Sequence, residues 1–387
     1  MNPNTITVLF ALLRSAVFDA QMTDEEKTLF SDEMLSELYA IAQKHSISPL
    51  LAYGLRRNGL AQKDDKSITQ TILLAAFRCE QLNHELSLLC NALESAEIPF
   101  IPLKGAVLCD YYPEPWMRTR CDIDILVHRD DLGKAISRLV QSLRYEEKER
   151  ATHDVLLLTP GGIHIELHFD LIEEGRANRA NDVLASVWEN VSLRENYNFW
   201  YEMSDAYFYF YHIAHMAAHF ETGGCGIRPF VDLYLLDNTE QICPDHRDGV
   251  LKEGDLLHFA EISRELSRSW FAGKETTALT QKMQDFILHG GTFGSVDNRV
   301  ALNQQKQGGR FGYLISRVFI PYPKLKRYYP ILEKHRWLLP VMQIKRWFML
   351  LKPDVARRTK SELAVNGSIE KSKANEMKLF LDDIGIR

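Results

Sequence analysis

The sequence lacks the features that mark disulfide-stapled, zinc-binding and membrane-spanning proteins. Its six cysteines are scattered with no C-x-x-C pair, so neither a disulfide framework nor a zinc site is expected. No run of about 18 apolar residues occurs, which predicts no transmembrane segment. The first residues have no positive segment before their apolar stretch and no small-residue cleavage site, so an amphipathic helix is predicted there instead of a signal peptide. We expect a reduced, cytoplasmic setting.

The chain also lacks the general excess of positive charge that a protein coating nucleic acid needs. Its 387 residues include 46 Lys and Arg against 52 Asp and Glu, a formal net charge of −6. The apolar share of 45% is that of an ordinary soluble protein, and the length suggests two or three domains. The charge is uneven, however, because 306–360 carries fourteen Lys and Arg but only Glu333 and Asp354 as acidic residues.

Hydrophobic periodicity divides the chain into four regions. Residues 1–95 are predicted helical, and a long periodic stretch without Gly or Pro, 67–98, begins within them. Residues 96–175 change to a strand pattern, 176–245 are predicted helical again, and 246–387 form further, basic helices. We therefore predict an α+β protein in which a small mixed-sheet core, 96–175, is flanked by N-terminal and C-terminal helical regions.

The predicted core alternates strands and helices over about 75 residues. A helix is expected from Ala106 to about 112 and another from about 130, the second with acidic residues in its first turn. Gly161-Gly162 is predicted to form the turn of a hairpin. The strands are expected at 98–103, 121–128, 153–160 and 163–171.

Acidic residues on two of these strands point to a metal site. Asp122 and Asp124 alternate with Ile123 and Ile125, so both carboxylates leave the same face of the strand. Two unpaired carboxylates on one face repel each other, and a divalent cation removes the repulsion. Such oxygen ligands suit Mg²⁺. Glu166 projects from the strand IHIELHF and would complete a two-metal site if its strand lies beside the first.

Two basic elements near this strand are candidates for binding phosphate. Lys104 and Gly105 lie where a strand gives way to a helix. Glycine permits close backbone approach, the helix N-terminus presents free N–H groups, and lysine adds a positive charge, so the pair is predicted to cradle a triphosphate. Arg118, in the loop before Asp122, is predicted to clamp the same phosphates bidentately.

Two further residues have both a functional and a structural interpretation. His168 shares a strand face with Glu166 and can contact phosphate or substrate, although a single histidine on a strand is often structural. Arg228 is a candidate for contact with the nucleotide. Its alternative is an ion pair with Asp232, four residues later on the same helix.

The segment LKGAVLCDYYPEPWMRTRCDIDILV, followed by IHIELHF, resembles the uncharacterised bacterial nucleotidyltransferases of the DNA polymerase β-like superfamily. That superfamily has a Gly-containing turn after a strand, an acidic-apolar-acidic strand and a third acidic strand. The resemblance implies transfer of a nucleoside monophosphate from an NTP to an acceptor, with release of pyrophosphate. Asp122, Asp124 and Glu166 would then be the catalytic residues that hold two Mg²⁺ or Mn²⁺ ions. The acceptor is left open among small molecules, sugars, proteins and RNA.

Two alternatives to this enzyme remain open. The usual Gly-Ser of the superfamily is here Lys104-Gly105, which is compatible with a non-catalytic binding or regulatory protein. An RNA-modifying toxin-like nucleotidyltransferase would use the basic stretch 306–360, where aromatic residues alternate with Lys and Arg. This composition suits contact with nucleic acid or with a membrane surface. We favour a third interpretation, in which the helices pack their aromatic side chains inward.

Overall fold

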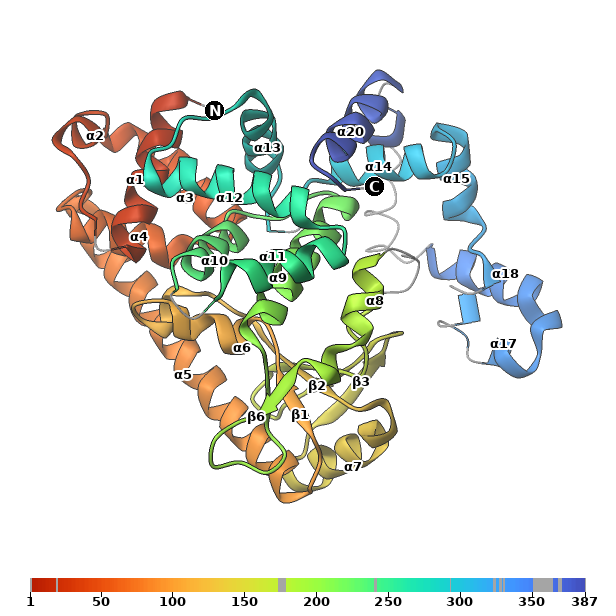
Figure 1. Ribbon diagram of the computed structural model, residues 1–387. Helices are drawn as coiled ribbons and strands as arrows, with labels where there is room; N and C mark the ends of the chain where they lie inside the picture. The colour runs from red at the N-terminus through yellow and green to blue at the C-terminus, as the bar shows by residue number, and fades with distance from the viewer. Residues whose placement is uncertain are drawn as a thin grey trace. The chain divides into compact units, whose positions relative to one another are not determined.

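The computed structural model divides into two compact units, Met1–Met216 with Gly226–Thr292, and Ala217–Cys225 with Phe293–Arg387. Figure 1 labels the α-helices and several of the strands. The four regions expected from the sequence remain a prediction. The described residues are 2–18, 20–172, 179–239, 242–292, 294–322, 325–326, 329, 331–350, 365–367 and 371–386.

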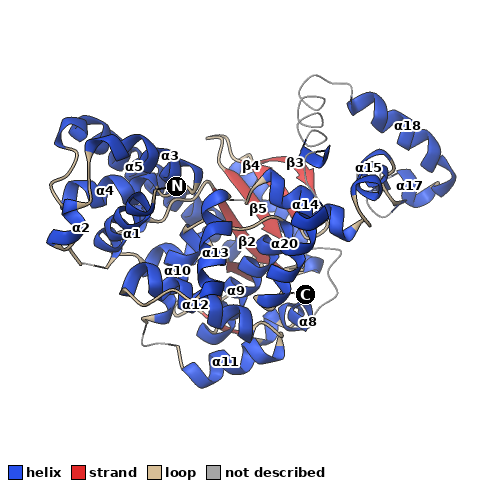
Figure 2. Cartoon of the chain, turned by 90° about the horizontal axis from the view of Figure 1, so that it is seen from above, coloured by secondary structure: helices blue, strands red, loops and turns tan. Residues whose placement is uncertain are grey.

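The first unit is built around a five-stranded mixed sheet with the strand order β1-β2-β5-β4-β3. β2 runs antiparallel to β1 but parallel to β5, while β5, β4 and β3 pair in antiparallel fashion. This small sheet among many helices confirms the predicted α+β class (Figure 2). The strands are β1 (Phe100–Pro102), β2 (Asp122–Val127), β3 (Glu146–Arg150), β4 (Asp154–Leu158) and β5 (His164–His168).

A two-stranded ribbon of β6 (Val191–Leu193) and β7 (Tyr201–Met203) forms a second sheet. It lies beside β1, because the backbone N–H of Phe100 donates to the carbonyl oxygen of Phe199 at 2.9 Å. The helix α9 (Asp205–Thr222) begins in the first unit and ends in the second. The other helices of the first unit include α1 (Pro3–Val17), α2 (Asp24–Thr28), α3 (Leu35–Lys44), α4 (Ser48–Arg57), α5 (Asp65–Ser95), α6 (Gly105–Leu108), α7 (Leu132–Leu143), α8 (Arg179–Ala185), α10 (Arg228–Asp237), α11 (Pro244–Glu253), α12 (Leu257–Ala272) and α13 (Ala278–His289).

One face of the sheet is covered by α5 and α7. The alternation of side chains along β2 and β5 sends their apolar residues into this layer, and burying them provides most of its stability. The same alternation turns the acidic side chains of β2 and β5 to the opposite face, away from the apolar layer. The buried layer includes Leu82, Leu89 and Leu93 of α5, Ile136 and Leu139 of α7, and Ile123, Ile125, Ile165 and Leu167 of the strands.

Four elements of this unit differ from the prediction: β6 and β7, which lie within 176–245 where only helix was predicted, and β3 and α6. The edge strand β3, with the sequence EEKER, was not predicted, because all of its side chains are exposed and it has no apolar alternation. The helix expected from Ala106 to about 112 is a single α-helical turn, α6, followed by a 3₁₀ turn at Cys109–Tyr111. Pro113 and Pro115 follow closely, and a proline disfavours helical backbone at the residue before it.

The second unit is helical in its described part. Val300 and Ala301 of α14 pack with Tyr313 of α15 in a small core. No helix among the described residues of either unit has both the length and the apolar character needed to cross a membrane. The elements of the second unit include α14 (Val296–Lys306), α15 (Arg310–Val318), α17 (Ile331–Lys334), the 3₁₀ helix η7 (Arg336–Leu338), α18 (Leu339–Leu350) and α20 (Lys371–Asp383).

Candidate active site

The acidic residues of β2 and β5 meet because the two strands are parallel neighbours. In their register, Asp124 lies directly opposite Glu166. Asp122 is two residues before Asp124 and leaves the same face of β2. The sequence-based expectation that the strand carrying Glu166 lies beside the strand carrying the two aspartates is therefore confirmed.

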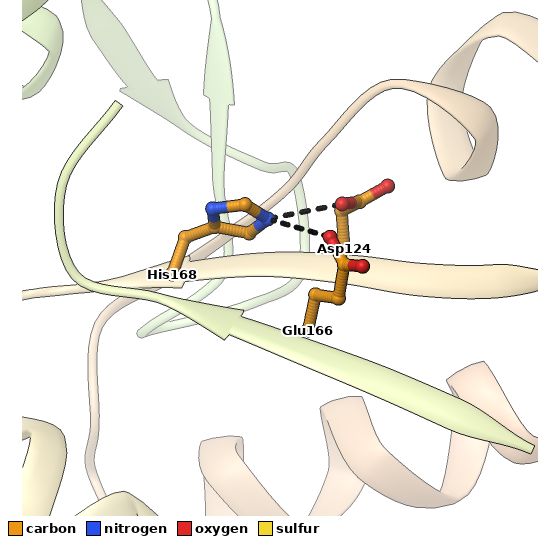
Figure 3. Close-up of side chains that lie close together, drawn as sticks. All are labelled: Asp124, Glu166 and His168. Atoms are coloured by element: carbon orange, nitrogen blue, oxygen red, sulfur yellow. Dashed lines mark hydrogen bonds and ion pairs between the residues drawn. The ribbon is translucent and has the colours of Figure 1, made fainter. Parts of the chain in front are cut away.

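Asp124 is the centre of a buried polar cluster. Its Oδ1 atom lies 3.0 Å from Nε2 of His168 and 3.1 Å from Nζ of Lys104. The same Nε2 atom of His168 lies 3.5 Å from Oε2 of Glu166. Figure 3 shows the side chains of Asp124, Glu166 and His168 converging from the two strands. His168 therefore lies within the carboxylate cluster that the sequence predicted.

The charges of this cluster hold Asp124 ionised. Burial alone would raise the pKa of Asp124, but Lys104 and His168 outweigh it and hold the pKa well below its ordinary value. Burial would likewise lower the pKa of Lys104, yet the carboxylate of Asp124 raises it above its usual range. Hydrogen bonds to Asp124 and Glu166 overcome burial at His168 and raise its pKa too.

At Asp122 the positive charges of Lys104 and Arg228 are too weak to offset the effects that raise its pKa. Burial raises its pKa, and the nearby charges of Asp124 and Glu166 raise it further. Three carboxylates face the ammonium of Lys104, with the guanidinium of Arg228 nearby, which leaves one formal negative charge in excess when His168 is neutral. An additional cation bound here would relieve that excess.

The donor atoms of the cluster fit a divalent metal ion. Asp124, Glu166 and His168 each offer a ligand atom, and these atoms lie within 4.8 Å of one another. Carboxylate oxygens suit Mg²⁺ and Mn²⁺, while an imidazole nitrogen is better matched to Mn²⁺ than to Mg²⁺. The metal would compete with Lys104 for Asp124, because the ammonium group already occupies a position beside Oδ1.

The turn between β1 and α6 carries Lys104 in a backbone conformation that is rare for a side-chain-bearing residue. Lys104 has φ +40° and ψ −110°, a region that favours glycine. The following Gly105 is needed for close packing, since a Cβ atom there would lie 2.9 Å from Nη1 of Arg118. Strained backbone of this kind persists where the surrounding structure fixes it, and here the contact of Lys104 with Asp124 does so.

Arg118 belongs to a second buried network. Its Nε and Nη2 atoms each donate to a carboxylate oxygen of Asp232 at 2.9 Å, and the hydroxyl of Tyr112 donates to the same carboxylate at 2.8 Å. Arg118 and Asp232 are both buried. Burial opposes ionisation of Asp232, but Arg118 holds its pKa below the ordinary value. The guanidinium predicted to clamp phosphate is thus engaged with a carboxylate.

The spacing of Arg228 and Asp232 predicted an ion pair along the helix as the alternative to a functional role. In the structure, Asp232 pairs with Arg118 instead. Arg228 instead donates from Nη1 to the carbonyl oxygen of Thr119 at 2.6 Å. It thereby fastens the loop that leads into β2. The positive charge of Arg228 also acts to lower the pKa of Asp122, so its guanidinium lies near the acidic face.

A comparison with protein families decides the assignment of the chain. The family model described as "Uncharacterised nucleotidyltransferase" matches residues 31–272, more than half of the 387 residues. The chain belongs to the uncharacterised nucleotidyltransferase family. No curated protein and no solved structure matches it.

The family match covers every residue for which the sequence predicted a role at the site. The structure brings Lys104, Asp122, Asp124, Glu166 and His168 together on one face of the sheet. The buried networks of Arg118 with Asp232 and of Arg228 with Thr119 lie in the same unit of this member of the nucleotidyltransferase family. Sequence reasoning missed the pairing of Lys104 with Asp124 and the role of Tyr112, because neither contact leaves a local pattern in the sequence.

Proposed function

We propose that this chain is a metal-dependent nucleotidyltransferase that moves a nucleoside monophosphate from an NTP to an acceptor and releases pyrophosphate. The observation that carries the proposal is the register of β2 and β5, which sets Asp124 opposite Glu166 with Asp122 on the same face. Membership of the nucleotidyltransferase family supports the same reaction class.

Asp122, Asp124 and Glu166 are the proposed metal ligands, and His168 either joins them or orients Asp124 and Glu166. A bound divalent ion such as Mg²⁺ or Mn²⁺, of which two are proposed, would neutralise phosphate charge and lower the pKa of the acceptor hydroxyl. Lys104 and Arg228 supply positive charge for the triphosphate. Arg118 reaches the phosphates only if its buried ion pair with Asp232 opens.

In the proposed reaction, the acceptor oxygen forms a bond to the α-phosphorus while the bond from that phosphorus to the β-phosphate oxygen breaks. The electron pair of the broken bond leaves with pyrophosphate, and the acceptor hydroxyl loses its proton. Asp124 is a poor proton acceptor, because Lys104 and His168 hold its pKa low. We therefore assign the proton to Glu166, a half-exposed carboxylate whose Oε2 atom lies 3.5 Å from Nε2 of His168.

The test is pyrophosphate release by the full chain with each NTP, Mg²⁺ or Mn²⁺, and a mixture of candidate acceptors. The proposal expects metal-dependent release or transfer of label from at least one NTP, lost when EDTA is added. A protein that binds NTP with Mn²⁺ but releases no pyrophosphate under any condition is the non-catalytic relative. A protein that binds neither ligand contradicts the site itself.

Replacing Lys104 with methionine is expected to make the protein more dependent on metal. The variant leaves the buried carboxylate of Asp124 without its ammonium partner, so the metal-free protein loses stability. Added Mn²⁺ then supplies the missing charge, and the rise in Tm with Mn²⁺ exceeds that of the wild type. Differential scanning fluorimetry measures both values. The control is Lys282→Met, which removes an exposed lysine of α13. If Mn²⁺ raises the Tm of the wild type and of both variants equally, Lys104 and the metal do not compete for Asp124.

Metal binding is expected to weaken as the pH falls through the pKa of Asp122, which lies above that of an ordinary aspartate. Burial and the neighbouring carboxylates raise this pKa, so below it a metal ion must displace a proton from Asp122. The apparent Kd for Mn²⁺ then rises by up to about tenfold per pH unit below that pKa. Titration calorimetry at several pH values measures this slope. The prediction fails if Asp122→Asn, which cannot hold the proton, retains the slope of the wild type.

A further inference from the structure

The helices α15 and α18 of the second unit each expose an apolar stripe. On α15, Phe311, Leu314, Ile315 and Val318 follow the spacing i, i+3, i+4, i+7, which places them on one side of the helix. Trp337 of η7 continues into α18 with the same kind of spacing, and all four side chains of that stripe are exposed. They are Trp337, Val341, Ile344 and Phe348.

Such exposure is the reverse of ordinary helix packing. Phe311 is 76% exposed, Trp337 74% and Phe348 68%, whereas an amphipathic helix in a globular protein buries its apolar side. The interpretation that these helices pack all their aromatic residues inward is therefore wrong for these three, although Tyr313 is buried in the small core with α14. Contiguous exposed apolar patches mark sites of interaction.

Polar contacts hold the inner side of α18 in place, so the apolar stripe is left outside. Nε1 of Trp347 donates to the carbonyl oxygen of Val318 at 2.8 Å, and Nη2 of Arg346 donates to that of Arg317 at 3.0 Å. The amide of Gln343, which is buried, donates to the carbonyl oxygen of Ile320. The first two bonds satisfy carbonyl groups at the C-terminal end of α15, which have no partner within the helix, and the third satisfies one just after it.

Basic residues accompany the two stripes. Between residues 306 and 350 the sequence has ten Lys and Arg and one acidic residue, Glu333. Arg310 at the start of α15 and Lys345 on α18 are exposed. A surface with exposed apolar stripes and nearby Lys and Arg is suited to an anionic lipid headgroup layer, into which apolar side chains insert while cations remain among the headgroups.

We propose that the apolar stripes of α15 and η7–α18, with their Lys and Arg neighbours, bind the surface of an anionic lipid bilayer. Five of the eight stripe residues are the aliphatic Leu314, Ile315, Val318, Val341 and Ile344, which cannot stack on bases as an RNA site requires. A second copy of the chain is disfavoured, because two such basic surfaces repel each other. Such binding would place the protein at a membrane surface, and it does not depend on the proposed nucleotidyl transfer.

The test is flotation of the full chain with vesicles of phosphatidylcholine, with or without phosphatidylglycerol. The wild type is expected to float with the anionic vesicles, to bind neutral vesicles at least about tenfold more weakly, and to dissociate as salt rises. Phe311→Ser/Ile315→Ser and Trp337→Ser/Phe348→Ser are each expected to lower binding by roughly tenfold or more. Because these side chains are exposed, circular dichroism and Tm are expected to stay unchanged.

A matched control comes from the first unit. Leu73 and Phe77 of α5 are each 62% exposed, so Leu73→Ser/Phe77→Ser removes similar exposed apolar area elsewhere and is expected to leave vesicle binding unchanged. The proposal is overturned if the wild type does not float with anionic vesicles, or if this control loses binding equally. It is also overturned if the stripe variants lose only single-stranded RNA binding, or only convert a dimer to a monomer by light scattering.

Discussion

The double variant Asp122→Ala/Asp124→Ala is expected to lose nucleotidyl transfer by about a thousandfold or more. It removes two of the three proposed metal ligands from one face of the sheet, and charge neutralisation by such metal ions supplies several kcal/mol of transition-state stabilisation. Transfer of label from the NTP that the wild type uses, followed over time, measures the loss. Calorimetry is expected to show that the double variant also binds Mn²⁺ more weakly than the wild type.

The two aspartates are expected to differ in their effect on stability. Asp122→Asn removes a carboxylate that its neighbours repel, so the metal-free protein gains stability while its metal binding weakens. Asp124→Asn removes the partner of Lys104 and His168, so the metal-free protein loses stability. The control Asp130→Ala/Asp131→Ala, at the start of α7, should leave activity unchanged, with only a small fall in Tm from the lost interaction with the helix N-terminus. Equal activity of the double variant and this control would contradict the assignment of Asp122 and Asp124 as ligands.

The largest loss of stability is expected from Asp232→Ala. This change leaves the buried guanidinium of Arg118 without the carboxylate that accepts both of its hydrogen bonds. Breaking a buried ion pair from one side costs about 3–5 kcal/mol, since an uncompensated charge stays buried. Tyr112 loses its hydrogen-bond acceptor as well. Urea denaturation, which gives the free energy of unfolding, is the measurement.

A double variant separates the cost of the unpaired buried charge from the other effects of Asp232→Ala on stability. Arg118→Met/Asp232→Leu replaces both partners with apolar side chains and is expected to recover most of the stability lost in Asp232→Ala. Arg118 also packs against Gly105, next to Lys104. The double variant is therefore expected to remain partly impaired in NTP binding even when folded. If Asp232→Ala unfolds at the same urea concentration as the wild type, the ion pair of Arg118 and Asp232 does not stabilise the fold as proposed.

The sheet strands that carry the site were predictable because they are strongly patterned. DIDILV and HIELH alternate polar and apolar residues, and the structure has β2 and β5 at these positions. The same pattern placed Asp122, Asp124 and Glu166 on faces that could meet. β3 was not predicted, because the side chains of EEKER are all exposed and show no apolar alternation. β6 and β7 were not predicted either, because strands of three residues are too short to show a periodicity.

The partners within the site could not be predicted in the same way. Lys104 and Asp124 lie 20 residues apart, and Arg118 and Asp232 lie 114 residues apart. Such contacts depend on how strands and helices pack in three dimensions, which a single sequence does not encode as a local pattern. The spacing of Arg228 and Asp232 suggested a helical pair, but the more distant Arg118 occupies both oxygens of that carboxylate. Tertiary packing here overrides a weak local preference.

The most direct test of the proposed site is a crystal of the full chain soaked with Mn²⁺ and a non-hydrolysable NTP, with data collected at the manganese absorption edge. The proposal predicts an anomalous peak bound by oxygens of Asp122, Asp124 and Glu166, with Nζ of Lys104 displaced from Asp124 towards the phosphates. Mn²⁺ bound elsewhere, or no manganese at this face while Lys104 stays on Asp124, would contradict it.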